Sequence, residues 1–228
     1  MYFKVLYMNT SEQNLEALKD IRSMMERSSR FISLSGRSGI SAGIFGLAGA
    51  WLADYKISQF REATGGGAAQ MPEGSFFSER LLTLQADLIK LAVCIFVLAC
   101  FTAFLFTWQK SKRSGMAIWG SSAQRLLWNT LLPMIAGGLV ILRLMEMEQY
   151  ILIAPVCLIF YGLGLINGSK YTLGEIRYLG YLEVILGVAG LWMPGQGLLL
   201  WAAGFGLLHI IYGTAMWWKY DRKGKSEA

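Results

Sequence analysis

Two titratable side chains stand inside long apolar stretches of this chain. Glu183 lies within the apolar segment Ile176–Met193. His209, the only histidine, lies within the segment Leu198–Trp218. A carboxylate and an imidazole in hydrocarbon can bind and release a proton, or hold a cation or a small polar ligand. They can equally form a structural hydrogen bond that fixes two helices together. We name Glu183, His209 and the nearby Tyr212 as candidate ligand-binding or proton-binding residues.

The turn between the two segments predicts that these groups share one depth. Residues 193–197 read Met-Pro-Gly-Gln-Gly, which is a turn signal. Helices that fold back around Gly195 or Gln196 would place Glu183 level with residues 207–209. Glu183 also follows the expected helix start near Leu173 by roughly 15 Å at ~1.5 Å per residue, which is near the centre of a bilayer. Whether Glu183 and His209 face each other stays open at this point.

Two further polar pairs stand near segment ends. Asp87 and Lys90 are three residues apart, and so are Arg143 and Glu146, so each pair can form an ion pair on one helix face. We expect two pairs at the outer membrane interface; the alternative is an outward vestibule lined by all four side chains. Neither pair has metal-ligand spacing, and one histidine without a cysteine cluster argues against zinc or haem. No cofactor and no metal site are expected.

Enzyme motifs are missing from the sequence. There is no Ser/His pair with elbow glycines, no HExxH run and no pair of aspartates at the expected inner face. The chain is therefore not expected to be an enzyme.

The elements that must position these residues are long apolar helices. The chain has 228 residues, of which 54% are hydrophobic and only 16% are charged, too few charges to cover a soluble domain of this size. A hydrocarbon layer of ~30 Å needs roughly 20 apolar residues in a helix. We expect an all-α integral membrane bundle of six transmembrane helices built from three helical hairpins, over Ile32–Ala53, Leu81–Trp108, Leu126–Leu144, Tyr150–Ile166, Ile176–Met193 and Leu198–Trp218.

The basic residues predict the orientation of this bundle. Sixteen of the 21 lysines and arginines fall on one side of the expected topology. Because Lys and Arg collect in cytoplasmic loops, both termini are expected in the cytoplasm of a bacterium, with the bundle in its inner membrane. The net charge of +6 follows from this bias, so no nucleic-acid partner is implied. The expected divisions are residues 1–30, the membrane domain 31–218 and a basic cytoplasmic tail 219–228.

Residues 10–30 predict an amphipathic helix before the first span. Apolar residues recur there at helical spacing, with charged residues between them. This helix could lie on the inner leaflet, pair with a second copy or a cytoplasmic protein, or pack under the bundle. In the first span, Ser35, Gly39 and Gly43 form a row of small residues, which favours a close helix crossing within the bundle or in a dimer.

The second half of the chain contains a repeated pattern and a family resemblance. Tyr161-Gly162 and Tyr212-Gly213 each stand late in a span that ends on Lys-Tyr. Residues 170–181 (KYTLGEIRYLGY) and 204–213 (GFGLLHIIYG), together with residues 9–35, resemble a family of uncharacterised membrane proteins of Bacteroidetes-type bacteria. The resemblance implies a polytopic membrane protein and no established activity. The chain departs from that family at Arg37, where an apolar residue is usual.

Two functions remain after this reading. The first, which the sequence favours because it shows few helix breaks and no obvious selectivity filter, is a non-enzymatic membrane module that senses or scaffolds. The alternative is a small transporter or channel for a proton, a cation or a small polar ligand, which would use Glu183 and His209. A polar cavity that reaches Glu183 beside an interrupted helix would favour the transporter, whereas a scaffold can be solid.

Overall fold

Helices make up every regular element in the part of the chain that the structure describes. The computed structural model describes residues 18, 35–64, 75–114 and 118–221. No strand occurs among these residues. The expected amphipathic helix over residues 10–30 lies outside them except for Leu18, and residues 222–228 of the expected tail lie outside them as well.

The helices follow the apolar segments closely. They are α2 (Gly36–Ala63), α3 (Ser75–Ser114), α4 (Ser121–Glu146), α5 (Ile153–Gly168) and α6 (Ile176–Gly190), with the short 3₁₀ turns η1 (Tyr150–Leu152) and η2 (Ser169–Tyr171) flanking α5. The last stretch, Gly197–Asp221, is one continuous helical rod that we call the terminal helix. It consists of α7 (Gly197–Trp201), the π-helical η3 (Ala202–Leu208), α8 (His209–Met216) and the π-helical η4 (Trp217–Asp221).

Four of these helical stretches are long and apolar enough to cross a membrane: Glu79–Arg113, Ser121–Glu146, Tyr150–Tyr171 and Gly197–Asp221. The other two expected spans differ for separate reasons. Helix α6 has only 15 residues, because its first turn begins at Ile176 and a loop follows Gly190. Helix α2 has 28 residues, but glycines and serines replace larger apolar residues along much of it.

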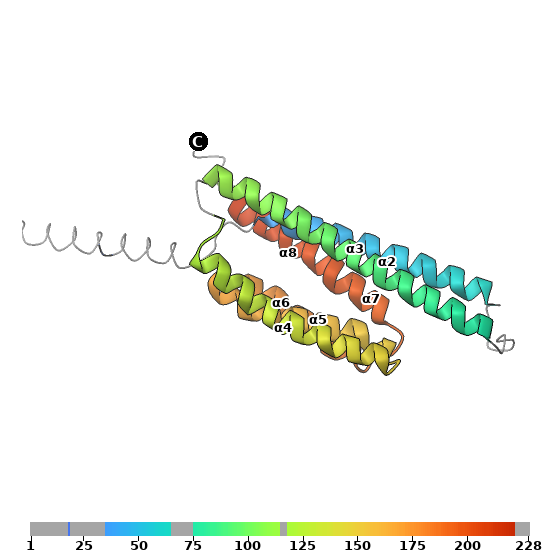
Figure 1. The fold of residues 1–228 in the computed structure, drawn as a ribbon. Helices are drawn as coiled ribbons and strands as arrows, with labels where there is room; N and C mark the ends of the chain where they lie inside the picture. Colours follow the sequence, from blue (N-terminus) through green and yellow to red (C-terminus); the bar gives the residue numbers. More distant parts are fainter. Residues whose placement is uncertain (1–17, 19–34, 65–74, 115–117, 222–228) are drawn as a thin grey trace, which may run out of the picture.

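The helices form two groups, which we call the first half and the second half. Helices α2, α3 and the terminal helix pack together as the first half, and α4, α5 and α6 pack together as the second half (Figure 1). The terminal helix packs mainly against α2, not against α6, so the third expected hairpin is open. The boundary between the halves, which we call the seam, therefore runs between α5 and α6 on one side and the terminal helix on the other.

Glycines explain this choice of partners. A Cβ on Gly39 of α2 would lie 3.0 Å from the Cα of Gly213 in the terminal helix. A Cβ on Gly162 of α5 would lie 2.6 Å from the carbonyl oxygen of Gly180 in α6. In lipid, where apolar burial gives helices no reason to associate, such close backbone approach supplies the dispersion contacts. The close crossing expected for the first span is confirmed, and each half contains one such crossing.

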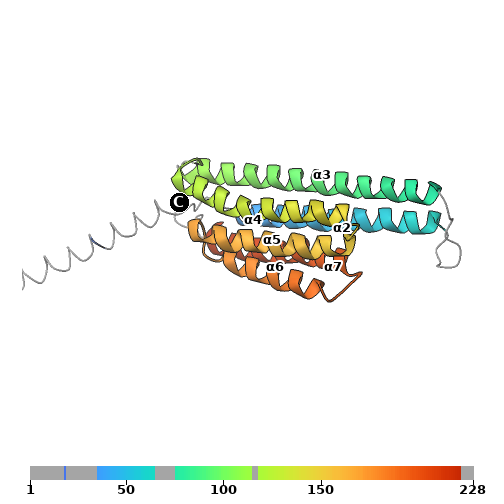
Figure 2. The ribbon, with the colours of Figure 1, turned by 60° about the horizontal axis from the view of Figure 1, so that its bottom comes forward.

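Helix α3 lies at the edge of the first half and marks the position of an apolar layer. Its run from Leu91 to Gln109 contains no charged residue and stands between Lys90 and Lys110. At ~1.5 Å per residue this run is about 28 Å long, which matches the hydrocarbon thickness of a bilayer. The connected ends of α2 and α3 project beyond the other helices at the end away from Lys110 (Figure 2).

One carboxylate joins the three helices of the first half at the Lys110 end. The Oδ2 atom of Asp221 accepts hydrogen bonds from the backbone N–H of Gly36 and the hydroxyl of Ser35, both at 3.0 Å. Its Oδ1 atom lies 2.8 Å from the Nζ of Lys110 on α3. A negative charge at a helix N-terminus is stabilising, so Asp221 both caps α2 and ties it to its two neighbours.

Candidate functional site

Glu183 lies at the midpoint of α6 and is completely buried, with 0% of its surface exposed. Neither carboxylate oxygen accepts a hydrogen bond from a described residue. The Nδ1 atom of His209 approaches Oε1 to 3.4 Å, across the seam. The structure therefore brings together the acid and the histidine that the sequence placed at one depth.

The hydrogen bonds of His209 assign its tautomer. Its Nδ1 atom lies 2.9 Å from the backbone carbonyl oxygen of Gly204. Because a carbonyl can only accept, Nδ1 carries the hydrogen and donates it. The Nε2 atom of the neutral ring is then the acceptor for the hydroxyl of Tyr161 at 2.7 Å. Tyr161 of α5 thus donates to His209, and the Nδ1–H of His209 lies beside Glu183.

The backbone next to the site is irregular. The seven residues Ala202–Leu208 directly before His209 form a π-helical segment. Such widened turns are rare and occur frequently at functional sites. Within this segment, a Cβ on Gly204 would lie 2.6 Å from Oε2 of Glu183, so the carboxylate sits against bare backbone. The terminal helix thus changes from α-helical to π-helical geometry at η3, directly before His209, and stays continuous.

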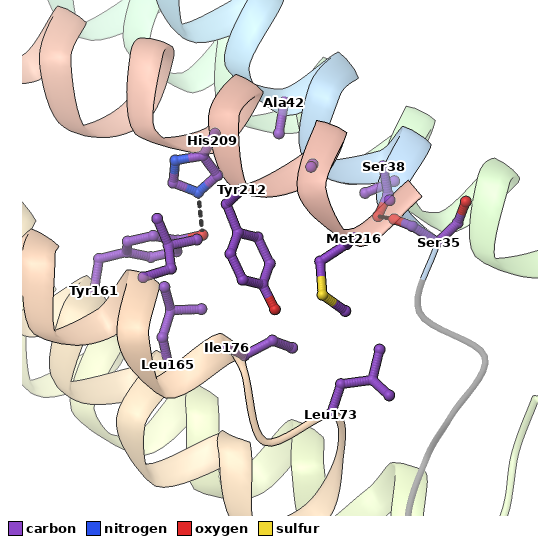
Figure 3. A pocket seen from close by; sticks show the side chains of 15 residues that line it. Ser35, Ser38, Ala42, Tyr161, Leu165, Leu173, Ile176, His209, Tyr212 and Met216 are labelled. Atoms are coloured by element: carbon purple, nitrogen blue, oxygen red, sulfur yellow. Dashed lines mark hydrogen bonds between the residues drawn. The ribbon is translucent and has the colours of Figure 1, made fainter. Parts of the chain in front are cut away.

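A cavity of about 180 Å³ opens beside His209 and runs along the seam toward the Lys110 end. His209, Tyr212 and Met216 of the terminal helix line one side of it, and Tyr161 and Leu165 of α5 line the other (Figure 3). The first turns of α2 and α6 and the loop before α6 complete the wall. The cavity is mainly apolar, and its polar side chains are His209, Tyr161 and Tyr212 together with Ser35 and Ser38 of the start of α2.

Tyr212 gives the cavity an unsatisfied hydroxyl. Its oxygen is buried and has no hydrogen-bond partner among the described residues. Its ring extends from the terminal helix across the space beside Tyr161 and Leu165 (Figure 3). The two Tyr-Gly pairs found in the sequence thus have a shared geometry: both tyrosines line the cavity, and the glycine after each packs closely against a neighbouring helix.

Aromatic rings close the seam on the other side of His209. The ring of Phe205 lies 5.1 Å from that of Tyr161 and 4.6 Å from that of Trp201, measured between centroids. The three rings form a row of tilted contacts from Tyr161 on α5 to the terminal helix. Tyr161 lines the cavity, whereas Phe205 and Trp201 do not.

An acid also crosses the seam at the Lys110 end. Glu175, in the loop before α6, accepts hydrogen bonds from Lys219 and Tyr220 of the terminal helix. Partial burial raises the pKa of Glu175, but the hydrogen bonds from Lys219 and Tyr220 outweigh this effect and hold the pKa below its ordinary value. The sequence predicted Glu175 in the first turn of a helix starting near Leu173. That prediction is wrong, because α6 begins only at Ile176 and the carboxylate reaches across the seam instead.

The outer polar pairs lie away from this site. Asp87 contacts Lys56 of α2 at 2.9 Å and Lys90 at 3.7 Å, so its shorter ion pair joins two helices and was not anticipated. Arg143 and Glu146 lie 2.7 Å apart on α4, as their spacing predicts. The side chains of Lys90, Arg143 and Glu146 are each at least 66% exposed, which is typical of surface ion pairs and not of a cavity wall.

Sequence reasoning missed two parts of the site. Tyr161 was noted only as half of a repeated pair, although the repeat itself was the signal that it shares a role with Tyr212. Gly204 gave no signal, because a π-helical segment has no recognisable sequence pattern. Among the described residues, no three His, Cys, Asp or Glu side chains lie close enough to hold a metal ion.

No family model, no curated protein and no solved structure matches this chain. The chemistry of the site must therefore be judged from its geometry. A buried carboxylate beside the N–H of a histidine, which in turn accepts from a tyrosine, is an arrangement that can store one proton and pass it along the row.

Proposed function

We propose that this chain is a small proton-linked membrane transporter, in which the Glu183–His209 pair binds and releases a proton at the seam between the two halves. The observation that carries the proposal is the position of the pair: Glu183 is a fully buried acid outside the cavity lining, and His209, whose Nδ1 atom lies 3.4 Å from the Oε1 atom of that acid, lines the cavity. An acid in hydrocarbon without a lysine or arginine partner is unfavourable to ionise, which favours a role in proton exchange.

The proposal places all six helices across the membrane. Four are long and apolar enough on their own. Helix α6 carries Glu183 at its midpoint and is extended by the apolar residues 191–193, and α2 has no charged residue from Ser38 to Ala53. The positive-inside rule then puts the Lys110 end, and both chain ends, in the cytoplasm of a bacterial inner membrane. The cavity would face the cytoplasmic side.

The hydrogen bond from Tyr161 to His209 and the 3.4 Å approach of Nδ1 to Oε1 of Glu183 supply a route for the proton. The route begins with Glu183 as a carboxylate and His209 neutral. A neutral proton donor in the cavity gives its proton to the Tyr161 oxygen and leaves as its conjugate base, while the Tyr161 hydroxyl passes its own proton to Nε2 of His209. The imidazolium then turns its Nδ1–H from the carbonyl oxygen of Gly204 toward Oε1 of Glu183 and releases that proton to the carboxylate. The ring ends neutral with its hydrogen on Nε2, and Glu183 ends protonated, so one proton has moved inward and no charge is left on Tyr161 or His209.

Proton flux tests this route directly. The purified chain is reconstituted into liposomes that contain a pH-sensitive dye, and a potassium diffusion potential drives proton entry. We expect flux above that of empty liposomes, and a reduction of at least about 10-fold in Glu183→Gln, since one general acid or base typically contributes 10²-fold or more. Glu146→Gln, which changes an exposed acid in the same way, should keep the wild-type flux. Wild-type flux equal to that of empty liposomes would exclude proton transport.

The second candidate is the sensing or scaffolding module. The tilted ring contacts of Tyr161, Phe205 and Trp201 favour it, because a seam packed with rings beside His209 can bind a proton without passing it on. Infrared titration separates the two candidates: a carboxyl band that responds to pH and disappears in Glu183→Gln, in a protein with no flux, would identify a sensor. A partner held through residues 10–30, either a second copy or a cytoplasmic protein, stays a prediction.

A further inference from the structure

We infer that the seam cavity binds a small, uncharged and largely apolar molecule of about one ring in size, held by a hydrogen bond between its hydroxyl group and Tyr212. This inference rests on the proposed function, because it takes the seam as the functional site of the transporter. It adds the chemical class of the solute, which proton exchange at Glu183 does not define.

The volume of the cavity limits the size of the occupant. The cavity measures about 180 Å³. An engineered apolar cavity of about 150 Å³ binds benzene, so the seam has room for a single ring with a small substituent.

The walls limit the charge of the occupant. Leu165, Leu179 and Met216 form much of the surface, with Ala42 and Ala103 behind them. No lysine, arginine, aspartate or glutamate belongs to the lining, and Glu183 lies outside it. An ion that entered would lose its hydration without gaining a counter-ion, which is strongly unfavourable. A neutral molecule that is mostly hydrocarbon meets no such penalty.

The polar groups define where a hydroxyl would bind. Both ring nitrogens of His209 are already engaged, with Gly204 and with Tyr161. The hydroxyls of Ser35 and Ser38, which also line the cavity, donate to Asp221 and to the carbonyl oxygen of Ser35. The hydroxyl of Tyr212 is buried, lines the same space and has no partner among the described residues. A buried polar group without a partner is unfavourable by a full desolvation penalty, so an occupant that supplies the missing hydrogen bond gains affinity at this position.

Two matched probes test this assignment. Binding of 4-fluorophenol and of fluorobenzene is measured by ¹⁹F NMR with the chain in lipid nanodiscs, after subtraction of their partition into empty nanodiscs. We expect 4-fluorophenol to bind about 10-fold more tightly, which is the contribution of one neutral hydrogen bond. Tyr212→Phe should bring the two affinities within about threefold by weakening 4-fluorophenol alone. Equal affinities in the wild type, or a preference that survives Tyr212→Phe, would overturn the assignment to Tyr212.

Cavity-filling variants locate the site independently of Tyr212. Ala103→Leu projects into the cavity and should abolish binding of both probes, whereas Ala92→Leu, on the exposed face of the same helix, should leave both unchanged. If Ala103→Leu still binds both probes, or if the wild type binds neither probe, the inference is overturned. Glu183→Gln should abolish proton uptake and keep the binding of 4-fluorophenol, so failure of the proton proposal and failure of this one give different results.

Discussion

The terminal helix carries two polar clusters that are built in opposite ways. Near its end, Lys219 pairs with Glu175 and Asp221 pairs with Lys110, so each acid has a cation within ion-pair distance. Near its middle, the acid Glu183 has only the ring of His209 beside it among the described residues, and no lysine or arginine. Both clusters hold helices together, but only the first uses complete ion pairs to do so.

The difference follows from the surroundings that we propose for each cluster. At the helix ends, headgroups and water solvate charges, so an ion pair is easily formed and contributes little. At mid-membrane depth a permanently charged pair would be unfavourable to bury, whereas a carboxyl group and an imidazole can both be neutral. The central cluster is therefore suited to exchange a proton, and the end cluster is suited to position helices. Substitutions at three positions sharpen this contrast.

The largest effect is expected at the centre. Glu183→Lys places an ammonium group with no acid partner at the midpoint of α6, which should destabilise the protein by more than about 3 kcal/mol, as an unpaired buried charge does. Glu183→Gln keeps the shape and should stay within about 1 kcal/mol. Thermal unfolding in detergent, followed by size-exclusion chromatography, measures both variants. A lysine variant as stable as the wild type would contradict the buried position of residue 183.

A smaller effect is expected at Asp221. Asp221→Ala removes the acceptor of the Ser35 and Gly36 hydrogen bonds and the partner of Lys110, and should destabilise the first half by about 1–2 kcal/mol, as lost helix caps do. The control is Glu62→Ala, an exposed acid near the other end of α2. If both alanine variants unfold at the same temperature in the thermal assay, Asp221 has no special role in joining the helices.

The smallest effect is expected at Glu175, where a pH titration is informative. Its pKa is lowered in the folded protein, so its contribution to stability is complete above the ordinary glutamate pKa and is lost as the pH falls through the lowered value. Because Glu175 and Lys219 are partly exposed, we expect Glu175→Gln to change stability by less than about 1 kcal/mol. The variant should unfold at the wild-type temperature once the pH is well below the lowered pKa of Glu175. If the difference in unfolding temperature between the wild type and Glu175→Gln increases as the pH is lowered, Glu175 does not stabilise the folded protein in its ionised form.

Much of the helical framework was predictable, because the positions of charged residues limit where an apolar helix can begin and end. The uncharged run of α3 between Lys90 and Lys110 could be read directly from the sequence, and so could the turn at Gly195, whose φ of 85° favours glycine. Counting residues on either side of that turn was enough to bring Glu183 and His209 to one depth. Their shared depth was therefore predictable from simple helix geometry, whereas their contact was not, because a residue count does not fix how each helix is rotated about its axis.

The partners of that pair were not predictable in the same way. Counting residues from the turn at Gly195 aligns α6 with the terminal helix, which the turn connects. It does not align α5, which carries Tyr161 and is not connected to the terminal helix by that turn. The open third hairpin also escaped prediction, because Gly39 and Gly213 lie far apart in the chain and only their fit shows that they meet. Polar spacing on α3 suggested Lys90 as the partner of Asp87, but the closer Lys56 belongs to α2.

Because of the π-helical segment, the exact number of residues between Trp201 and His209 determines which way His209 and the residues after it face. An α-helix turns by about 100° per residue, and a π-helical turn accommodates one residue more than an α-helical turn does. Deleting a single residue between Trp201 and His209 would let this stretch become regular α-helix and would rotate all that follows. His209 would turn away from Glu183, and Gly213 would leave its crossing with Gly39. Any relative of this chain that shares its function should therefore tolerate substitutions in this stretch more readily than insertions or deletions.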